Sequence, residues 1–348
     1  MKDTIFFGID FHKNKSVICA LYQDGSAVFP IKSIQSKKIY EFFNNKEPAK
    51  LAIEASGGTN EVVSRLRAMG HEVLLVNSNV FRGIGIGGKK TDSRDAKALA
   101  NYLRLGGVSE VHVKSLYSRN IKSLIVSREM VLRSKVNLMN HIRGTLKEYG
   151  ILIPVGPKNF FKEAPQKIAS LESVLIRETL EEILKTILSF VDRQKFIENQ
   201  LKQQVLNNPQ VELLQSIPGV GELGASMAVS VIDDISRFRN SREFASYLGL
   251  TPRVHSSADK RMMGSISKSG PEILRRYLIH GARAWMKYSP DKDPNRKWAE
   301  KVKERRGMNK ATVALAHRMS RIMFAVLRDE VEYNGRKKKK AKVTKMAA

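Results

Sequence analysis

Apolar runs separated by polar turns divide the first third of the chain into short strands and helices. Strands are expected at residues 5–10, 16–22, 27–31, 51–54 and 72–77, and helices at residues 37–43 and 60–69. The Asp24-Gly25 pair is a hairpin signal, so the first three strands are expected to form a meander. Strands in succession, followed by alternating helix and strand, are typical of an α/β fold with a mixed sheet.

Longer apolar stripes at helical spacing fill the rest of the chain. Residues 118–149 predict one long helix, Gly150 to Pro157 breaks it, and residues 166–207 predict a second with a partial heptad stripe. That stripe fits either a coiled coil between protomers or a helical hairpin within one chain. Further helices are expected at residues 238–250, 274–288 and 310–327, with a polar, serine-rich loop at residues 251–270.

The turn Pro218-Gly-Val-Gly221, which leads into an alanine-rich helix, predicts a helix-hairpin-helix element. Such a turn either presents the N–H groups around Gly219 and Gly221 to a DNA phosphate or simply packs the domain. We therefore expect an α/β domain, a connector of long basic helices, a mainly α domain and a basic, disordered tail. Their expected bounds are residues 1–112, 113–210, 211–330 and 331–348.

Charge indicates the class of partner. The 348 residues include 61 Lys and Arg against 34 Asp and Glu, which gives a formal net charge of +27. Such an excess attracts polyanions, with nucleic acid the first candidate and an anionic membrane surface the second. No apolar run is long enough to span a bilayer, no signal-peptide pattern begins the chain, and the single Cys19 allows no internal disulfide. We therefore expect a cytoplasmic protein that does not cross a membrane.

Four carboxylates stand where the predicted fold can bring them together. Asp10 and Glu54 end predicted strands, and Asp92 and Asp95 share one face of the first turns of a helix. Carboxylates so close repel one another, so a Mg²⁺ or Mn²⁺ pair is the natural occupant, and the hard oxygen donors argue against zinc. Each acid also has a purely structural explanation. Asp92 and Asp95 fit the solvated first turn of a helix that is capped by Thr91 or Asp92. Asp10 could cap a turn, and Glu54 could form an ion pair with a lysine.

Basic residues and turn glycines mark the candidate contacts with nucleic acid. Lys90 and Arg94 flank the helical acid pair, and a loop at residues 81–90 brings glycines and basic residues that suit either phosphate contact or flexibility. The other candidates lie on the long helix, in the glycine turn and in the serine-rich loop: Arg128, Arg133, Gly219, Gly221, Arg253, Lys260, Arg261 and Lys268. From these residues alone, the loop at 251–270 suits phosphate binding or disorder better than it suits a nucleophile.

Three N-terminal motifs resemble those of a group of insertion-sequence transposases that includes the pilin-gene DNA invertase. They are Gly-Ile-Asp-x-x-Lys at Gly8–Lys13, Glu-Ala-Ser-Gly at Glu54–Gly57, and Lys-Thr-Asp-x-x-Asp-Ala at Lys90–Ala96. The resemblance implies an RNase H-like (RuvC-like) α/β domain whose Asp-Glu-Asp-Asp set is Asp10, Glu54, Asp92 and Asp95. It also implies a separate C-terminal serine domain.

The C-terminal half is similar to the serine domain of the same group. The motifs are Gly-Leu-Thr-Pro-Arg at Gly249–Arg253, Ile-Ser-Lys-x-Gly at Ile266–Gly270, and Leu274-Arg275. In the group, the serine of the intervening loop usually precedes a glycine; here Ala258 takes that place, so the alignment points to Ser257, with the adjacent Ser256 as the alternative nucleophile.

The resemblance implies a transposase or site-specific recombinase. The four acids would bind Mg²⁺, and Ser257 would attack a DNA phosphodiester to give a phosphoserine link that the free hydroxyl of a strand resolves. Its partners would be donor and target DNA, a bridge RNA, and further copies of the chain, as a dimer or tetramer in which the serine of one subunit joins the acidic site of another.

Two other classes of function remain open at this point. A RuvC-like nuclease or junction resolvase would cut with water and would not need Ser257. A nucleic-acid-binding protein without catalysis would not need the acids. A sugar-kinase-like ATPase fits poorly, because the sequence lacks the phosphate loops that such an enzyme needs.

Overall fold

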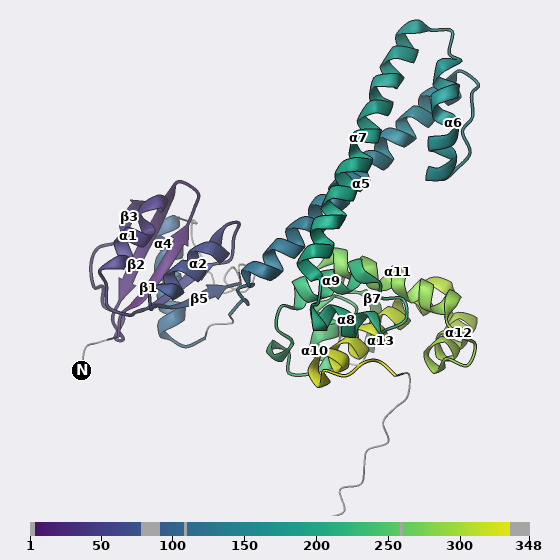
Figure 1. The fold of residues 1–348 in the computed structure, drawn as a ribbon. Coiled ribbons are helices and arrows are strands. Elements are labelled where there is room, and N and C mark those ends of the chain that lie inside the picture. Colours follow the sequence, from purple (N-terminus) through teal and green to yellow (C-terminus); the bar gives the residue numbers. More distant parts are fainter. Residues whose placement is uncertain (1–3, 78–90, 108–109, 258–259, 335–348) are drawn as a thin grey trace, which may run out of the picture. The chain divides into compact units, whose positions relative to one another are not determined.

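The computed structural model describes residues 4–77, 91–107, 110–257 and 260–334, with the side chains of 254–257 and 260–262 left outside the description (Figure 1). The chain forms two compact units, which we call the N-terminal unit (Met1–Lys114) and the C-terminal unit (Ser115–Ala348). The predicted disorder of the tail concerns mainly residues 335–348, which lie outside the described residues. Within the described part of the chain, no helix has the length and apolar character to cross a bilayer.

A five-stranded mixed sheet forms the centre of the N-terminal unit, as expected. Its strands are β1 (Phe6–Phe11), β2 (Lys15–Leu21), β3 (Lys32–Gln35), β4 (Lys50–Glu54) and β5 (Glu72–Val76). They are ordered β3-β2-β1-β4-β5, antiparallel from β1 to β3 and parallel from β1 to β5. This is the RNase H-like arrangement that the resemblance implies.

Helices cover both faces of this sheet because side chains alternate along each strand. Phe7 and Ile9 face the apolar side chains of α1 (Ile39–Asn44) and α2 (Thr59–Ala68). Phe6 faces the opposite side, where it packs against α4 (Asp92–Arg104). The acids at the carboxyl end of β1 and the start of α4 are therefore placed on the same side of the sheet.

The third strand is not where the sequence predicted it. The Asp24-Gly25 turn forms, with Gly25 at φ 91°, but Ala27 makes only an isolated bridge to Leu21. Pro30 has no N–H to give to a ladder, so the expected strand at 27–31 does not continue. The chain joins the sheet two residues later, where Lys32 to Gln35 pair with β2.

A helical stalk begins the C-terminal unit. It consists of α5 (Leu116–Glu148), α6 (Pro157–Ala169) and α7 (Val174–Val205). Helices α5 and α7 pack along each other within the chain, and α6 joins their far ends through a cluster that includes Ile142, Phe160 and Ile187 (Figure 1). Of the two packings that the heptad stripe allowed, this chain therefore contains the intramolecular hairpin.

The second long helix of the prediction is wrong at its start. Instead of one helix from 166 to 207, the structure has a separate α6 that begins at Pro157 and a break at residues 170–173. Proline is well suited to the first position of a helix, because its missing N–H has no partner there in any case. Ser170 is the C-cap of α6 and Ser173 is the N-cap of α7. Between them, Leu171 packs into the same apolar cluster as Ile142, Phe160 and Ile187, which holds the turn in place.

The rest of the C-terminal unit is mainly helical, as expected. Its helices are α8 (Pro209–Gln215), α9 (Glu222–Ile232), α10 (Ser241–Tyr247), α11 (Glu272–Tyr288), α12 (Pro294–Arg306) and α13 (Met308–Asp329), with a short 3-10 turn at Ile235–Arg237. They enclose a core that contains Phe244 and Trp285. The sequence did not predict α12, because it is mostly charged and buries little apolar surface apart from Ala299.

The predicted loop at 251–270 contains a β-hairpin. Strands β6 (Pro252–Ser257) and β7 (Lys260–Ile266) pair antiparallel, with Ser256 opposite Arg261 and Ser257 opposite Lys260. The polar composition concealed these strands, because neither has the apolar alternation of a half-buried strand.

Candidate functional site

The carboxyl edge of the N-terminal sheet carries two of the predicted acids. Strands β1 and β4 run parallel, and their last paired residues are Ile9 and Ile53. The next residue of each strand is an acid, Asp10 and Glu54 respectively. Carboxyl ends of parallel strands are where sheets of this kind place their functional groups. Asp10 is only 6% exposed, whereas Glu54 is half-buried.

Gly8 allows α4 to bring two further acids to this edge. A Cβ on Gly8 would lie 2.0 Å from the backbone oxygen of Ala96, so only glycine permits the helix to cross β1 this closely. Asp92 lies one turn before Ala96, and Asp10 lies two residues beyond Gly8. The first turn is fixed by Thr91, whose hydroxyl accepts a hydrogen bond from the backbone N–H of Arg94 at 3.4 Å. Of the two predicted caps, Thr91 therefore has this role.

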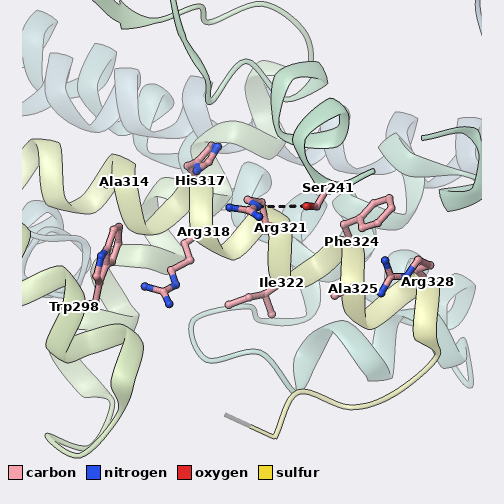
Figure 2. A pocket seen from close by; sticks show the side chains of 10 residues that line it. All are labelled: Ser241, Trp298, Ala314, His317, Arg318, Arg321, Ile322, Phe324, Ala325 and Arg328. Carbon is pink, nitrogen blue, oxygen red and sulfur yellow. Dashed lines mark hydrogen bonds between the residues drawn. The ribbon is translucent and has the colours of Figure 1, made fainter. Parts of the chain in front are cut away.

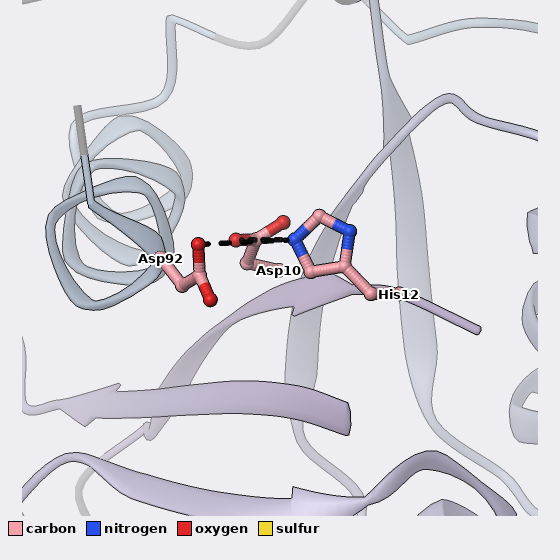
Figure 3. A group of neighbouring side chains, drawn as sticks. All are labelled: Asp10, His12 and Asp92. Atoms are coloured by element: carbon pink, nitrogen blue, oxygen red, sulfur yellow. Dashed lines mark hydrogen bonds and ion pairs between the residues drawn. The ribbon is translucent and has the colours of Figure 1, made fainter. Parts of the chain in front are cut away.

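Three side chains converge at the meeting point of β1 and α4 (Figure 3). His12 Nε2 lies 3.1 Å from Asp10 Oδ2 and 4.0 Å from Asp92 Oδ1. One ligand atom from each of the three residues lies within 4.8 Å of the other two, a spacing that can hold a metal ion. Asp10 is buried, while His12 and Asp92 are exposed, so the group opens to solvent on one side.

Burial raises the pKa of the Asp10 carboxyl above its ordinary value, the neighbouring His12 opposes that shift, and the charges of Asp92 and Asp95 add to it. A nearby cation offsets the repulsion between such carboxylates and favours their ionised forms. The donor set therefore fits a divalent ion: carboxylates suit Mg²⁺ and Mn²⁺, and the imidazole adds a donor that Mg²⁺ rarely uses.

His12 was not among the residues predicted from the sequence. The segment that carries it is held by two buried serines: Ser36 Oγ donates to the backbone oxygen of His12 at 2.6 Å, and Ser16 Oγ lies 2.7 Å from Ser36 Oγ. The available signal was the alternation Asp10-x-His12, which places two ligand-type side chains on the same side of an extended segment.

The remaining members of the predicted acid set lie near this group but outside it. Glu54 ends the neighbouring strand, and Asp95 lies on the first turn of α4, where its charge acts on Asp10. Neither belongs to the group of three whose ligand atoms lie within 4.8 Å. Arg94 lies exposed on the same turn, while Lys90 lies outside the described residues.

The β6–β7 hairpin carries the predicted serines at its turn end. Ser256 and Ser257 are the last residues of β6; their side chains, and those of Lys260 and Arg261, lie outside the description. Arg253 and Lys268, at the base of the hairpin, are exposed, and Arg253 Nη2 donates to the backbone oxygen of Ser267 at 3.0 Å.

Two glycines and a buried arginine anchor the base of this hairpin. A Cβ on Gly249, at φ 68°, would lie 2.1 Å from Ser269 O, and one on Gly270 would lie 2.0 Å from Tyr247 O. The Arg275 guanidinium, only 8% exposed, donates from Nη1 to Ser269 O at 3.0 Å and to Leu248 O at 3.2 Å. These contacts fix the positions of the segment between α10 and β6 and of the segment between β7 and α11.

The stalk residue Arg128 does not suit the phosphate contact predicted for it. It is largely buried, with Nε 2.7 Å from Glu198 Oε1 on α7 and Nη1 3.2 Å from Glu129 Oε1. Glu129 in turn accepts hydrogen bonds from Arg276 and from the hydroxyl of Tyr277, both on α11. Arg128 therefore belongs to an ion-pair network that joins α5, α7 and α11, whereas Arg133 remains exposed.

The predicted glycine turn lies between α8 and α9, where it has a packing role. Gly219 has φ 81°, and a Cβ there would lie 2.1 Å from the backbone oxygen of Gly281 on α11. A Cβ on Gly281 would lie 2.4 Å from Gly219 O, so the two backbones are in direct contact. Gly221 is the N-cap of α9. Phosphate contact at this turn stays a prediction.

Comparison with known proteins relates both halves of the chain to mobile elements. The profile described as "Transposase IS116/IS110/IS902 family" matches residues 211–296, and a DEDD transposase profile of the IS110 type matches residues 7–151. The transposase for insertion sequence element IS1111A of Coxiella burnetii is 31% identical over 96% of this chain and 92% of its own length.

Two further relatives span this chain to different extents. A probable family 20 transposase of Pseudomonas aeruginosa is 29% identical over 94% of each chain. The pilin gene-inverting protein of Moraxella lacunata is 31% identical over 37% of this chain and 40% of its own length.

Proposed function

This chain belongs to the IS110/IS116 family of insertion-sequence transposases, and on that premise we propose that it breaks and rejoins DNA strands with two sets of its own residues. The first set is the acids Asp10, Glu54, Asp92 and Asp95, and the second is Ser257 with the basic residues of its hairpin. The observation that carries the proposal is the convergence of Asp10 and Asp92 at the carboxyl edge of the sheet, made possible by Gly8.

The acids hold a divalent cation, Mg²⁺ or Mn²⁺, with His12 as an additional donor. When bound, such an ion supplies a Lewis acid that polarises a phosphodiester. Asp10 contributes a buried, fixed carboxylate, and Asp92 contributes an exposed one that can adjust to the DNA. Glu54 and Asp95 add further negative charge at the carboxyl edge of the sheet. Burial, and to a smaller extent the charges of Asp92 and Asp95, raise the pKa of Asp10, and a bound cation would favour its ionised form.

Ser257 supplies the nucleophile. Its Oγ attacks a DNA phosphorus, the bond from phosphorus to the 3′ oxygen breaks, and the leaving oxygen takes up a proton as Ser257 loses its own. A free 3′ hydroxyl then attacks the phosphoserine, which restores the serine and joins the new strand. The support is the position of Ser257 at the turn end of a hairpin whose base is anchored and carries Arg253 and Lys268. Ser256 is the alternative nucleophile.

Donor and target DNA, a bridge RNA and further copies of the chain are the proposed partners. The charge of +27 supports polyanionic partners. The stalk supports self-association, because it leaves large apolar side chains exposed, among them Met130 at 70% and Phe196 at 64%. A dimer or tetramer would cover these side chains and bring the serine of one copy to the acids of another.

A RuvC-like nuclease that cuts with water is the second candidate. It is favoured by the group Asp10–His12–Asp92, which can hold a metal ion without any contribution from the serine hairpin. The two candidates differ in whether the protein becomes linked to DNA.

Covalent trapping tests the proposal. The full chain is incubated with Mg²⁺, element-end RNA, and labelled donor and target DNA, then denatured and examined for protein-linked DNA. We expect an adduct that is lost in Ser257→Ala and in the near-isosteric Asp10→Asn, and kept in Ser256→Ala. An adduct lost in Ser256→Ala alone moves the nucleophile to Ser256. Cleavage without adduct, equal in both serine variants, overturns the serine mechanism and leaves the nuclease.

A further inference from the structure

The outer face of α13 carries a basic pocket that neither the acids nor the serine hairpin account for (Figure 2). It has a volume of about 610 Å³, and residues on successive turns of α13 form most of it. Ser241 of α10 and Trp298 of α12 complete the wall. The α13 residues of the pocket that matter for binding are His317, Arg318, Arg321, Ile322, Ala325 and Arg328.

Two of the three arginines in this pocket keep an unneutralised charge. Arg328 is paired with Asp329 through contacts of 2.8 and 3.0 Å. Arg318 and Arg321 form no ion pair with any residue that the structure describes. Burial lowers the pKa of His317, and the adjacent Arg321 adds to that shift, so the neutral form of the imidazole is favoured. The net character of the pocket is therefore that of two guanidinium cations.

Each of these guanidinium groups is held by a neighbour. Arg318 lies over the ring of Trp298, 4.8 Å from its centre, and Arg321 Nε donates to Ser241 Oγ at 3.3 Å (Figure 2). A guanidinium already held in place loses less side-chain entropy when it binds an anion, and its planar fork matches the oxygens of a phosphate. Beside these cations, Ile322 and Ala325 supply an apolar surface.

This combination fits one kind of ligand. The volume is that of a pocket for a small molecule or a single residue of a polymer, and a cation pair beside an apolar wall matches a phosphate attached to a planar base. In a duplex, the faces of the bases are stacked inside, so only phosphates, sugars and base edges reach a protein surface. An unpaired nucleotide, by contrast, can present its phosphate and its base to the same pocket.

We propose that this pocket binds one nucleotide of an unpaired nucleic-acid strand, with its phosphate on Arg318 and Arg321 and its base against Ile322 and Ala325. The proposal goes beyond strand cleavage, because none of these residues belongs to the acid set or to the serine hairpin. It would hold if the serine mechanism failed. Unpaired DNA and unpaired RNA share this chemistry, and the experiment separates them.

The two tryptophans of the chain allow a local measurement. Trp298 lines the pocket, whereas Trp285 is 1% exposed in the core, so a ligand in the pocket changes the emission of Trp298. The full chain is titrated with thymidine and uridine octanucleotides, with a DNA duplex of the same length, and with inorganic phosphate. We expect saturable quenching by an unpaired strand at concentrations at least tenfold lower than by the duplex, and no quenching in Trp298→Phe.

Arginine variants test which charges are used. Arg318→Ala and Arg321→Ala should each weaken strand binding by about tenfold. The double variant should reduce the slope of log affinity against log salt by about 0.7, because the two arginines hold one phosphate and each phosphate contact on a single strand contributes about 0.7. Arg239→Ala is the matched control, since Arg239 is exposed and paired with Glu243. Unchanged core emission from Trp285 verifies the fold of each variant.

The outcomes separate the sources of the ligand. Quenching by the thymidine strand, the uridine strand or both supports the pocket and identifies the sugar that it accepts. Equal quenching by the duplex, quenching by inorganic phosphate as strong as by the strands, or a double variant that binds like Arg239→Ala would each overturn the proposal.

Discussion

Replacement of Glu129 by alanine should be among the most damaging single changes in the C-terminal unit outside its apolar core. Glu129 is 16% exposed and lies between Arg128 and Arg276, whose side chains are 12% and 34% exposed, while the hydroxyl of Tyr277 donates to it at 2.8 Å. The substitution leaves two guanidinium groups and one hydroxyl without this acceptor at a place where water reaches them poorly.

The structure sets the magnitude. Removal of one partner from a buried ion pair costs roughly 3–5 kcal/mol, and the partial exposure of Arg276 places this case near the lower limit, about 3 kcal/mol. The matched control is Glu182→Ala on α7. Its pair with Lys185 is short, at 2.7 Å, but both side chains are about 70% exposed. A pair so exposed to solvent contributes little to the free energy of unfolding.

Denaturant unfolding followed by tryptophan fluorescence measures the difference, because both tryptophans lie in the C-terminal unit. We expect the free energy of unfolding to fall by about 3 kcal/mol in Glu129→Ala and to stay nearly unchanged in Glu182→Ala. Glu129→Gln should fall between them, because the amide keeps an acceptor for Tyr277 and loses the charge. If Glu129→Ala and Glu182→Ala agree within about 1 kcal/mol, burial does not decide the strength of these pairs and the reasoning is refuted.

Three further predictions concern other parts of the chain. Burial and the hydrogen bond to Glu129 raise the pKa of Tyr277 to about 12, above the ordinary 10, so the contribution of Tyr277 to stability is complete below pH 10 and is lost between pH 10 and 12. In denaturant titrations, the difference in unfolding free energy between the wild type and Tyr277→Phe should therefore become smaller between pH 10 and 12. A difference that stays constant over this pH range would contradict the prediction. Gly249→Ala would place a Cβ 2.1 Å from Ser269 O at a positive φ and so disturb the base of the hairpin. We expect this variant to lose the covalent adduct with DNA but to bind metal ions as the wild type does in calorimetry. A variant that forms as much adduct as the wild type would contradict this. His12→Ala should weaken the binding of Mn²⁺ about tenfold and the binding of Mg²⁺ less, because an imidazole donor favours the softer ion. Calorimetry measures both affinities. An equal loss of affinity for the two ions would exclude His12 as a ligand.

The sheet was predictable where local pattern decides structure. Strands β1, β2, β4 and β5 are short apolar runs between polar turns, and the acids at the ends of β1 and β4 follow from the direction of parallel strands. The helix start at Thr91 follows from its capping side chain. These features depend on residues that are close in sequence.

The missed features depend on contacts that are distant in sequence. The β6–β7 hairpin is polar and has no alternation to reveal it; its base is fixed by Gly249 against Ser269 and by Arg275, up to 26 positions along the chain from Gly249. His12 joins the acid group from a segment whose backbone is held by Ser36, from beyond β3. Arg128 could not be separated from a surface cation, because the acids that pair with it come partly from α7, 70 residues later.

The contact between Gly219 and Gly281 has a mechanical consequence. Side chains that touch can change rotamer and absorb a displacement, but two backbones in direct contact cannot, so the turn before α9 and the helix α11 must move as one body. The same helix holds the hairpin base through Arg275 and the stalk through Tyr277. Helix α11 thus joins the turn, the hairpin base and the stalk within about two helical turns, so a displacement of one of them is passed on to the other two.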